Sequence, residues 1–229
     1  MQNTNIKDLF NKIAFKYDKV NHVTSLNIDK IWRKKALKNT INENDSVLDI
    51  ACGTADSCIE AIKQGANNVI GLDISEQMLK IAENKINKDD KYKKQIQLVL
   101  SESDILPFEN NFFDVVSIFF GIRNIPEYDQ ILTEVYRVLK NNGKLIILEL
   151  SMPTIFPINY LYNFYFKNIL PIIGGSISGQ KKAYQYLYKS VKNFPDQNTF
   201  NDILKRNNFK NVNCKKYSLG IATCFKAIK

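Results

Sequence analysis

Two acidic side chains, Asp49 and Asp73, are placed where they could hold a charged cofactor. Asp49 lies in an apolar run, 46–50, and Asp73 directly follows a second run, 68–72, and each run is typical of a buried β-strand. Because the carboxyl ends of parallel strands meet at one edge of a sheet, both carboxylates are expected to reach one ligand. The alternative interpretation is two ordinary buried strands that end in acids.

The residues after the first strand favour a cofactor without phosphates. The G-x-G-x-x-G spacing of a dinucleotide site is absent around Gly53, and Asp49 would repel a pyrophosphate. S-adenosylmethionine, with an ammonium, a sulfonium and a ribose diol, fits better. Gly53 would let the backbone approach its amino-acid end, Thr54 would donate to its carboxylate, and Asp49 would hold the ammonium. Asp73 would accept both ribose hydroxyls.

A third strand, 96–100, ends close to further acids. Asp104 is the better candidate to accept a hydrogen bond from the adenine amino group, and Glu102 and Ser103 lie beside it. Most acidic side chains in loops are only solvated. The assignment of Asp104 to the adenine therefore rests on the position of this residue after a strand.

The elements that must position these residues alternate along the chain. Helical spacing covers 6–40, strands are expected at 46–50, 68–72, 96–100, 114–120 and 144–150 with helices between them, and a helix and hairpin close the chain. This order predicts an α/β Rossmann-like fold. It has a mostly parallel seven-stranded sheet with an antiparallel C-terminal hairpin and an N-terminal helical cap. One domain is expected: cap 1–45, cofactor-binding core 46–150, substrate-side insertion 151–195, closing unit 196–229.

The stretch 155–173 is apolar and aromatic, yet it does not resemble a membrane span. Pro157 and Pro171 bracket it, and Asn159, Asn163 and Lys167 interrupt it. Its spacing indicates an amphipathic helix. This helix either packs on the sheet or forms the wall of a site for a lipophilic substrate and contacts lipid.

Composition sets limits on the class of protein. The 229 residues carry a net charge of +9, from 32 basic and 23 acidic side chains, which suits nucleic acid, an anionic membrane surface or a lysine-rich exterior. Four cysteines without a C-x-x-C pair and one histidine argue against a zinc site, so no metal is expected. The first residues lack the apolar core of a signal peptide, so the protein is expected in the cytoplasm.

Several motifs together resemble one family. They are V-L-D-I-A-C-G-T-A from Val47, G-L-D-I-S-E-Q-M-L from Gly71, F-G-I-R-N-I from Phe120, L-E-L-S-M-P from Leu148 and F-P-D-Q from Phe194. The chain resembles the class I S-adenosylmethionine-dependent methyltransferases, and within them the ubiquinone/menaquinone biosynthesis C-methyltransferases, over nearly its whole length. The resemblance implies the class I methyltransferase fold. It departs from the usual G-T-G-D loop at Ala55, which is costly if this residue needs a positive φ.

The resemblance implies methyl transfer from S-adenosylmethionine to a ring carbon of a prenylated quinol, with demethylmenaquinol favoured over the ubiquinone precursor. It implies a catalytic role for Arg123 in substrate deprotonation, as an oxyanion stabiliser beside water, with Asn124 orienting the same group. The alternative for Arg123 is a structural ion pair with Glu149. Further candidate residues complete the list: Tyr17, Ile74 and Phe119 for the cofactor, and Tyr162, Phe166, Tyr184 and Tyr186 for the quinol.

Other interpretations stay open from sequence alone. His22, the one histidine, is either a base or structural, and Tyr17 either covers the cofactor or packs in the core. Trp32 with Arg33, Lys34 and nearby lysines suggests a basic, aromatic helix for transient contact with the inner face of the membrane. The competing functions are an RNA methyltransferase and a non-catalytic scaffold. For the favoured function we expect no nucleic-acid partner, and a homodimer is possible.

Overall fold

A computed structural model describes residues 3–102 and 105–229, with side chains from residue 6 onward. Seven strands form one sheet in the order β3-β2-β1-β4-β5-β7-β6. Strands β1 to β5 pair in parallel, and β7 is antiparallel to both β5 and β6. The strands are β1 (Ser46–Ile50), β2 (Asn68–Asp73), β3 (Ile96–Leu100), β4 (Phe113–Phe119), β5 (Leu139–Leu150), β6 (Lys210–Tyr217) and β7 (Ala222–Ile228).

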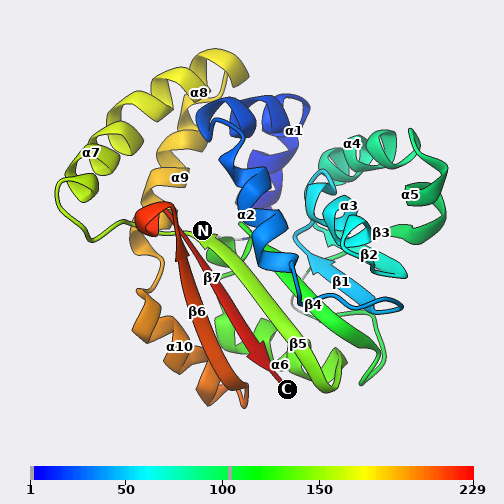
Figure 1. The fold of residues 1–229 in the computed structure, drawn as a ribbon. Helices are drawn as coiled ribbons and strands as arrows, with labels where there is room; N and C mark the ends of the chain where they lie inside the picture. Colours follow the sequence, from blue (N-terminus) through cyan, green and yellow to red (C-terminus); the bar gives the residue numbers. More distant parts are fainter. Residues whose placement is uncertain (1–2, 103–104) are drawn as a thin grey trace.

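Helices cover both faces of the sheet, which gives three layers (Figure 1). One apolar core joins the sheet to α2 (Ile28–Leu37), α3 (Asp56–Lys63) and α4 (Glu76–Ile86). A second core joins the opposite face to α6 (Tyr128–Val138) and α10 (Gln197–Arg206). Alternate residues of β1 show the division, since Val47 belongs to the first core and Leu48 to the second.

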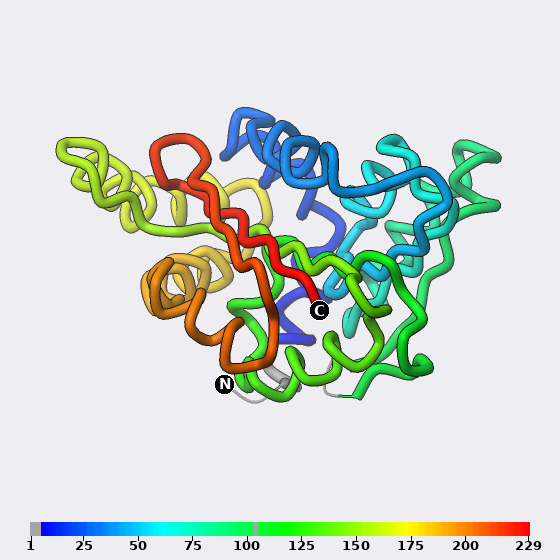
Figure 2. Tube along the Cα trace, turned by 60° about the horizontal axis from the view of Figure 1, so that its bottom comes forward, coloured from blue at the N-terminus to red at the C-terminus, as the bar shows by residue number. Residues whose placement is uncertain are grey.

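A third core lies outside the sheet. It gathers α1 (Asn3–Thr24), the start of α4, α7 (Ile158–Phe164), a π-helical turn (Tyr165–Ile169), α8 (Leu170–Ser178) and α9 (Lys181–Asn193). Figure 1 shows these helices together at one end of the sheet, and Figure 2 shows α7 extending beyond the rest of the molecule. The polar and catalytic candidates lie between this helical cap and the sheet.

The predicted fold class is confirmed, and local differences have physical reasons. Ser75 caps α4 as the pattern suggests, its Oγ accepting from Met78 N at 3.2 Å. A short helix, α5 (Asp90–Gln95), was not predicted, because its six residues have no buried side chain and hence no apolar period. Strand β5 starts at Leu139 rather than Lys144, since Asn141–Gly143 are accommodated by a register irregularity in the pairing with β4.

The helix predicted at 155–173 is present, but it begins and ends later in the chain. A helical path runs from Ile158 to Ser178, and Pro171 is tolerated in the first turn of α8. The spacing places Tyr162, Tyr165, Phe166, Leu161 and Ile169 on one apolar side of this helix. Phe166 is buried and Tyr162 and Tyr165 are half-buried, but Leu161 and Ile169 are exposed. The segment therefore presents apolar side chains on two sides. No helix within the described residues has the length and apolarity needed to cross a bilayer.

Candidate active site

Asp73 ends β2 with its carboxylate fixed by backbone donors. Gly53 N donates to Oδ2 and Ser75 N donates to Oδ1, both at 2.8 Å. Burial raises the pKa of Asp73, while these N–H groups act in the opposite direction. Gly53 adopts φ 56°, which a glycine enters without strain. The first loop and the second strand are thereby held together beside a cavity.

Asp49 does not reach that cavity wall. Its oxygens accept from Ser57 Oγ at 2.5 Å and Ser117 Oγ at 2.6 Å, and from the Cys58 thiol at 3.4 Å. The side chain is buried, and burial raises its pKa despite these donors. The expectation that Asp49 holds the cofactor's ammonium is not supported by this geometry, because its acceptors are already occupied inside the protein.

The unusual alanine in the loop does need a positive φ. Ala55 has φ 66° and ψ 21° and precedes α3, with no exposed surface. A left-handed conformation costs a non-glycine residue about 1–2 kcal/mol. The loop therefore keeps the shape that glycine usually provides, at the expense of some strain.

The cavity beside Asp73 collects most of the predicted cofactor residues. It contains about 780 Å³ of empty space, part of it open to solvent. Its wall includes Tyr17, Gly53, Asp73, Ile74, Glu102, Phe119 and also Asn124. Ser103 and Asp104 lie outside the described residues. The Asp73 carboxylate, the Gly53 backbone and the exposed acid Glu102 after β3 are groups that suit the ribose diol, the amino-acid end and the adenine amino group of S-adenosylmethionine.

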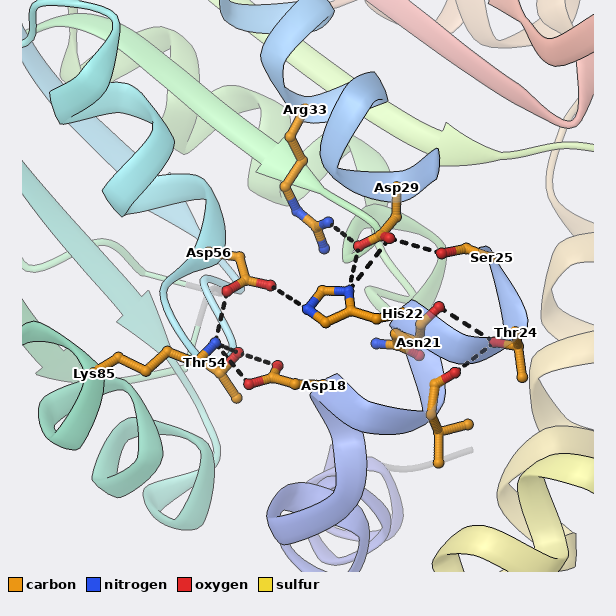
Figure 3. A network of polar contacts seen from close by, with 11 residues as sticks. Asp18, Asn21, His22, Thr24, Ser25, Asp29, Arg33, Thr54, Asp56 and Lys85 are labelled. Atoms are coloured by element: carbon orange, nitrogen blue, oxygen red, sulfur yellow. Dashed lines mark hydrogen bonds and ion pairs between the residues drawn. The ribbon is translucent and has the colours of Figure 1, made fainter. Parts of the chain in front are cut away.

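Thr54 points away from this cavity. Its hydroxyl donates to Asp18 Oδ1 at 2.6 Å and accepts from Lys85 Nζ at 2.8 Å. Lys85 Nζ also lies 2.6 Å from Asp56 Oδ1 and from Asp18 Oδ2. Thr54 therefore connects α1 to the loop instead of meeting the cofactor's carboxylate, as Figure 3 shows.

A second cavity adjoins the first. It contains about 1020 Å³ of empty space, part of it open to solvent, and shares Phe10, Tyr17 and Phe120 with the cofactor cavity. The four predicted quinol residues, Tyr162, Phe166, Tyr184 and Tyr186, all lie on its wall. Burial raises the pKa of Tyr17, which belongs to both cavities, so this phenol remains neutral at the boundary.

Arg123 lies on the wall of the larger cavity and forms the ion pair that was the alternative interpretation. Nη1 is 2.6 Å from Glu149 Oε1 and donates to Phe120 O at 2.5 Å. Arg123 Nε is buried and has no hydrogen-bond partner in the structure among the described residues. The two interpretations are compatible, because the ion pair uses Nη1 while the side chain still lines the cavity.

Asn124 is tied to the substrate side by Tyr186. The Tyr186 hydroxyl donates to Asn124 Oδ1 at 3.0 Å, and the two residues belong to different cavities. Asn124 lies in a 3₁₀ turn, Ile122–Asn124, directly after β4. The amide is therefore held where the two cavities adjoin.

The basic helix suggested for membrane contact is corrected by the structure. Trp32 is buried, and its indole N–H donates to Ser218 Oγ at 3.0 Å. Arg33 is also buried, with Nη1 2.5 Å from Asp29 Oδ2. Asp29, Arg33 and Ser25 line the larger cavity, which was not predicted from the sequence. The helical spacing of residues 28–37 could have indicated that Asp29 and Arg33 share the buried side of α2 with Trp32.

Comparisons with known proteins identify the family of this chain. The model of the ubiE/COQ5 methyltransferase family matches residues 1–229. A demethylmenaquinone methyltransferase of Oceanobacillus iheyensis is 39% identical over 228 residues, which is 98% of this chain and 94% of the relative. A ubiquinone/menaquinone biosynthesis C-methyltransferase of Citrifermentans bemidjiense is 38% identical over 227 residues, 98% and 96% of the two chains.

Solved structures support the fold. A methyltransferase dependent on S-adenosylmethionine from Thermotoga maritima superimposes with a TM-score of 0.70 at 18% identity, covering 97% of this chain and 99% of the other. At this identity the likeness concerns the fold alone. With the family match over every residue, the chain belongs to the ubiE/COQ5 methyltransferase family and is an S-adenosylmethionine-dependent methyltransferase.

Proposed function

We propose that this enzyme methylates a ring carbon of a prenylated quinol, with demethylmenaquinol as substrate and menaquinol as product. The observation that carries the proposal is the pair of adjoining cavities, one with the anchored Asp73 carboxylate and one with a largely aromatic and aliphatic wall. Relatives named demethylmenaquinone methyltransferase are among the most similar proteins and favour the menaquinone branch.

The chemistry requires activation of the quinol. A ring carbon becomes nucleophilic when a neighbouring hydroxyl loses its proton, and S-adenosylmethionine supplies the electrophilic methyl group. The Arg123 guanidinium, which lines the larger cavity and is held in place by Glu149, would donate to the developing oxyanion. Asn124, oriented by Tyr186, would hold the same ring hydroxyl or a water molecule beside it. The aromatic wall would exclude bulk water from the ring.

Because a prenylated quinol is lipophilic and resides in the bilayer, the enzyme would contact the membrane surface at its cytoplasmic side. The outer side of α7 and α8 exposes apolar side chains, while the inner side of the same helices lines the substrate cavity. Residues 151–195 include five lysines and no acidic residue, which suits anionic headgroups. The exposed apolar residues include Phe156, Tyr160, Leu161, Phe164, Ile172 and Ile173. A homodimer remains a prediction from the sequence.

The direct test uses purified protein, S-adenosylmethionine and reduced demethylmenaquinol of short tail. The expected product, found by mass spectrometry, is the quinol with one added methyl group on the ring. A parallel reaction with a demethylated ubiquinone precursor separates the two branches. If neither quinol is methylated while S-adenosylmethionine binds, the proposed substrate class is wrong.

A further inference from the structure

One buried carboxylate faces the proposed substrate cavity. Among the described residues that line this cavity, Asp29 of α2 is the sole acid. Its side chain is 7% exposed and accepts from Ser25 Oγ at 2.7 Å and Arg33 Nη1 at 2.5 Å. Burial acts to raise the pKa of Asp29, but Arg33 and Ser25 outweigh it, so the pKa lies below its ordinary value. Asp29 is therefore an ionised acceptor in the cavity wall at neutral pH.

His22 of α1 lies next to this carboxylate. Nδ1 is 3.3 Å from Asp29 Oδ1 and 3.2 Å from Oδ2, while Nε2 on the other edge of the ring is 3.7 Å from Asp56 Oδ2. Figure 3 shows the ring between the two carboxylates. The side chains of His22 and Asp56 are 21% and 25% exposed, unlike that of Asp29. A continuous polar line thus leads from the cavity wall to solvent.

Charged groups surround the His22 ring. Asp29 and Asp56 face it directly, and an oxygen of Asp18 lies within 4.8 Å of a ring nitrogen. Two permanent cations pair with these carboxylates, Arg33 with Asp29 and Lys85 with both Asp18 and Asp56. The ring therefore stands between a buried carboxylate of the cavity wall and a partly exposed one.

C-methylation of a quinol releases a proton, because a ring C–H bond is replaced by a C–CH₃ bond and the donor loses its positive charge. We propose that Asp29 and His22 form the route by which the proton of the quinol hydroxyl leaves the cavity. This inference rests on the proposed function. It identifies Asp29 as the catalytic residue that touches the hydroxyl or a water molecule bound to it, and His22 as a relay that acts through Asp29.

The transfer balances atom by atom. The hydroxyl O–H bond breaks, its electron pair stays on oxygen, and the proton moves to a carboxylate oxygen of Asp29. From there it moves to Nδ1 of His22, whose neutral ring carries its hydrogen on Nε2, and Nε2 gives that hydrogen to Asp56 or to water. After methyl transfer the C–H bond at the methylated carbon breaks, its electron pair restores the aromatic ring, and the ring oxygen takes back one proton, so one proton is released per turnover.

The experiment removes the imidazole ring of His22 by mutation and adds free imidazole to the reaction. Single-turnover rates are measured with saturating S-adenosylmethionine for the wild-type enzyme, His22→Ala and His22→Gln, with and without added imidazoles. His22→Ala is expected to lose about 10–100-fold in rate, in line with typical general acid–base contributions. Imidazole should restore much of this rate in His22→Ala but not in His22→Gln, where the amide fills the space.

A series of substituted imidazoles distinguishes proton transfer from simple filling of a hole. The restored rate should vary with the basicity of the added imidazole if it carries the proton. Asp18→Asn is the control for the surrounding charges, since it removes a carboxylate that pairs with Lys85 but leaves the Asp29–His22 and His22–Asp56 contacts in place, and its rate should not respond to imidazole. Affinity for S-adenosylmethionine, measured by calorimetry, is expected to stay within about threefold in His22→Ala, because a relay residue affects the chemical step and not binding.

Two results would overturn the relay. One is a His22→Ala rate within twofold of wild type, and the other is a loss that no imidazole restores or that follows a parallel loss of cofactor affinity. Failure of the proposed function looks different, because the wild-type enzyme itself would then leave the quinol unmethylated. Asp29→Asn is a poor first variant, since it strands the buried Arg33 charge.

Discussion

Arg123 and Glu149 form an ion pair of 2.6 Å whose side chains are almost wholly shielded from water. Glu149 lies near the end of β5 and Arg123 lies just after the neighbouring β4, so the sheet itself brings them together. Burial raises the pKa of Glu149, and the guanidinium opposes that shift. The pair places a fixed positive group in the wall of the substrate cavity.

Removing this guanidinium should affect both chemistry and stability. Arg123→Ala is expected to lower turnover by about 100-fold or more, as loss of a single oxyanion donor does. It should also reduce the free energy of unfolding by about 3–5 kcal/mol, because Glu149 is left buried and unpaired. Rates and urea unfolding curves measure the two effects.

The double variant Arg123→Met with Glu149→Leu separates them. Stability should recover, since no buried charge remains, whereas turnover should stay low. Recovery of both would assign Arg123 a structural role only.

Asp73 is expected to govern cofactor affinity. Asp73→Ala removes a carboxylate from the cavity wall and also the acceptor of Gly53 N and Ser75 N. Binding of S-adenosylmethionine should weaken by about 1–3 kcal/mol, the usual loss for a charged hydrogen-bond partner. Isothermal titration calorimetry gives the value. Asp114→Ala, which removes a strand carboxylate outside both cavities, serves as control, and equal affinity in the two variants would refute the ribose assignment.

The loss of folding stability at acid pH should depend on Asp56. Burial acts to raise the pKa of Asp56, but the Lys85 ammonium and other charges outweigh it, so the folded pKa lies below the ordinary value. A depressed folded pKa contributes stability above the unfolded pKa of about 4 and loses it as pH falls through the folded pKa. Urea midpoints between pH 7 and pH 2 should therefore fall less steeply in Asp56→Asn than in wild type. Parallel curves for the two proteins would contradict the prediction.

Membrane contact should depend on the outer side of α7 and α8. Replacement of Phe156, Phe164 and Ile172 by serine is expected to reduce binding to vesicles containing anionic lipid by at least about tenfold, since each removes a large exposed apolar group. Co-sedimentation with vesicles measures this binding.

Phe112→Ser provides the matched control for that experiment. Phe112 is 44% exposed and directly precedes β4, away from the cap. Its loss should leave vesicle binding unchanged. Equal behaviour of the control and the triple variant would exclude α7 and α8 as the contact surface.

Local sequence determined the sheet. Each of the strands β1, β2 and β3 is a short apolar run with its own turn signals, so their bounds followed from neighbouring residues alone. The acid at the end of β2 and the glycine after β1 likewise predicted a cofactor edge, because parallel strands must deliver their carboxyl ends together.

Only the tertiary structure decided which polar group faces which partner. Asp49 is turned to Ser117, Thr54 to Asp18 and Trp32 to Ser218, pairs separated by 68, 36 and 186 residues. The wall of the substrate cavity likewise combines α1, α2, α7 and α9. Residue type gives a side chain its chemistry, but packing of distant elements fixes its orientation and burial, and these decide whether a carboxylate meets a ligand, a proton or another side chain.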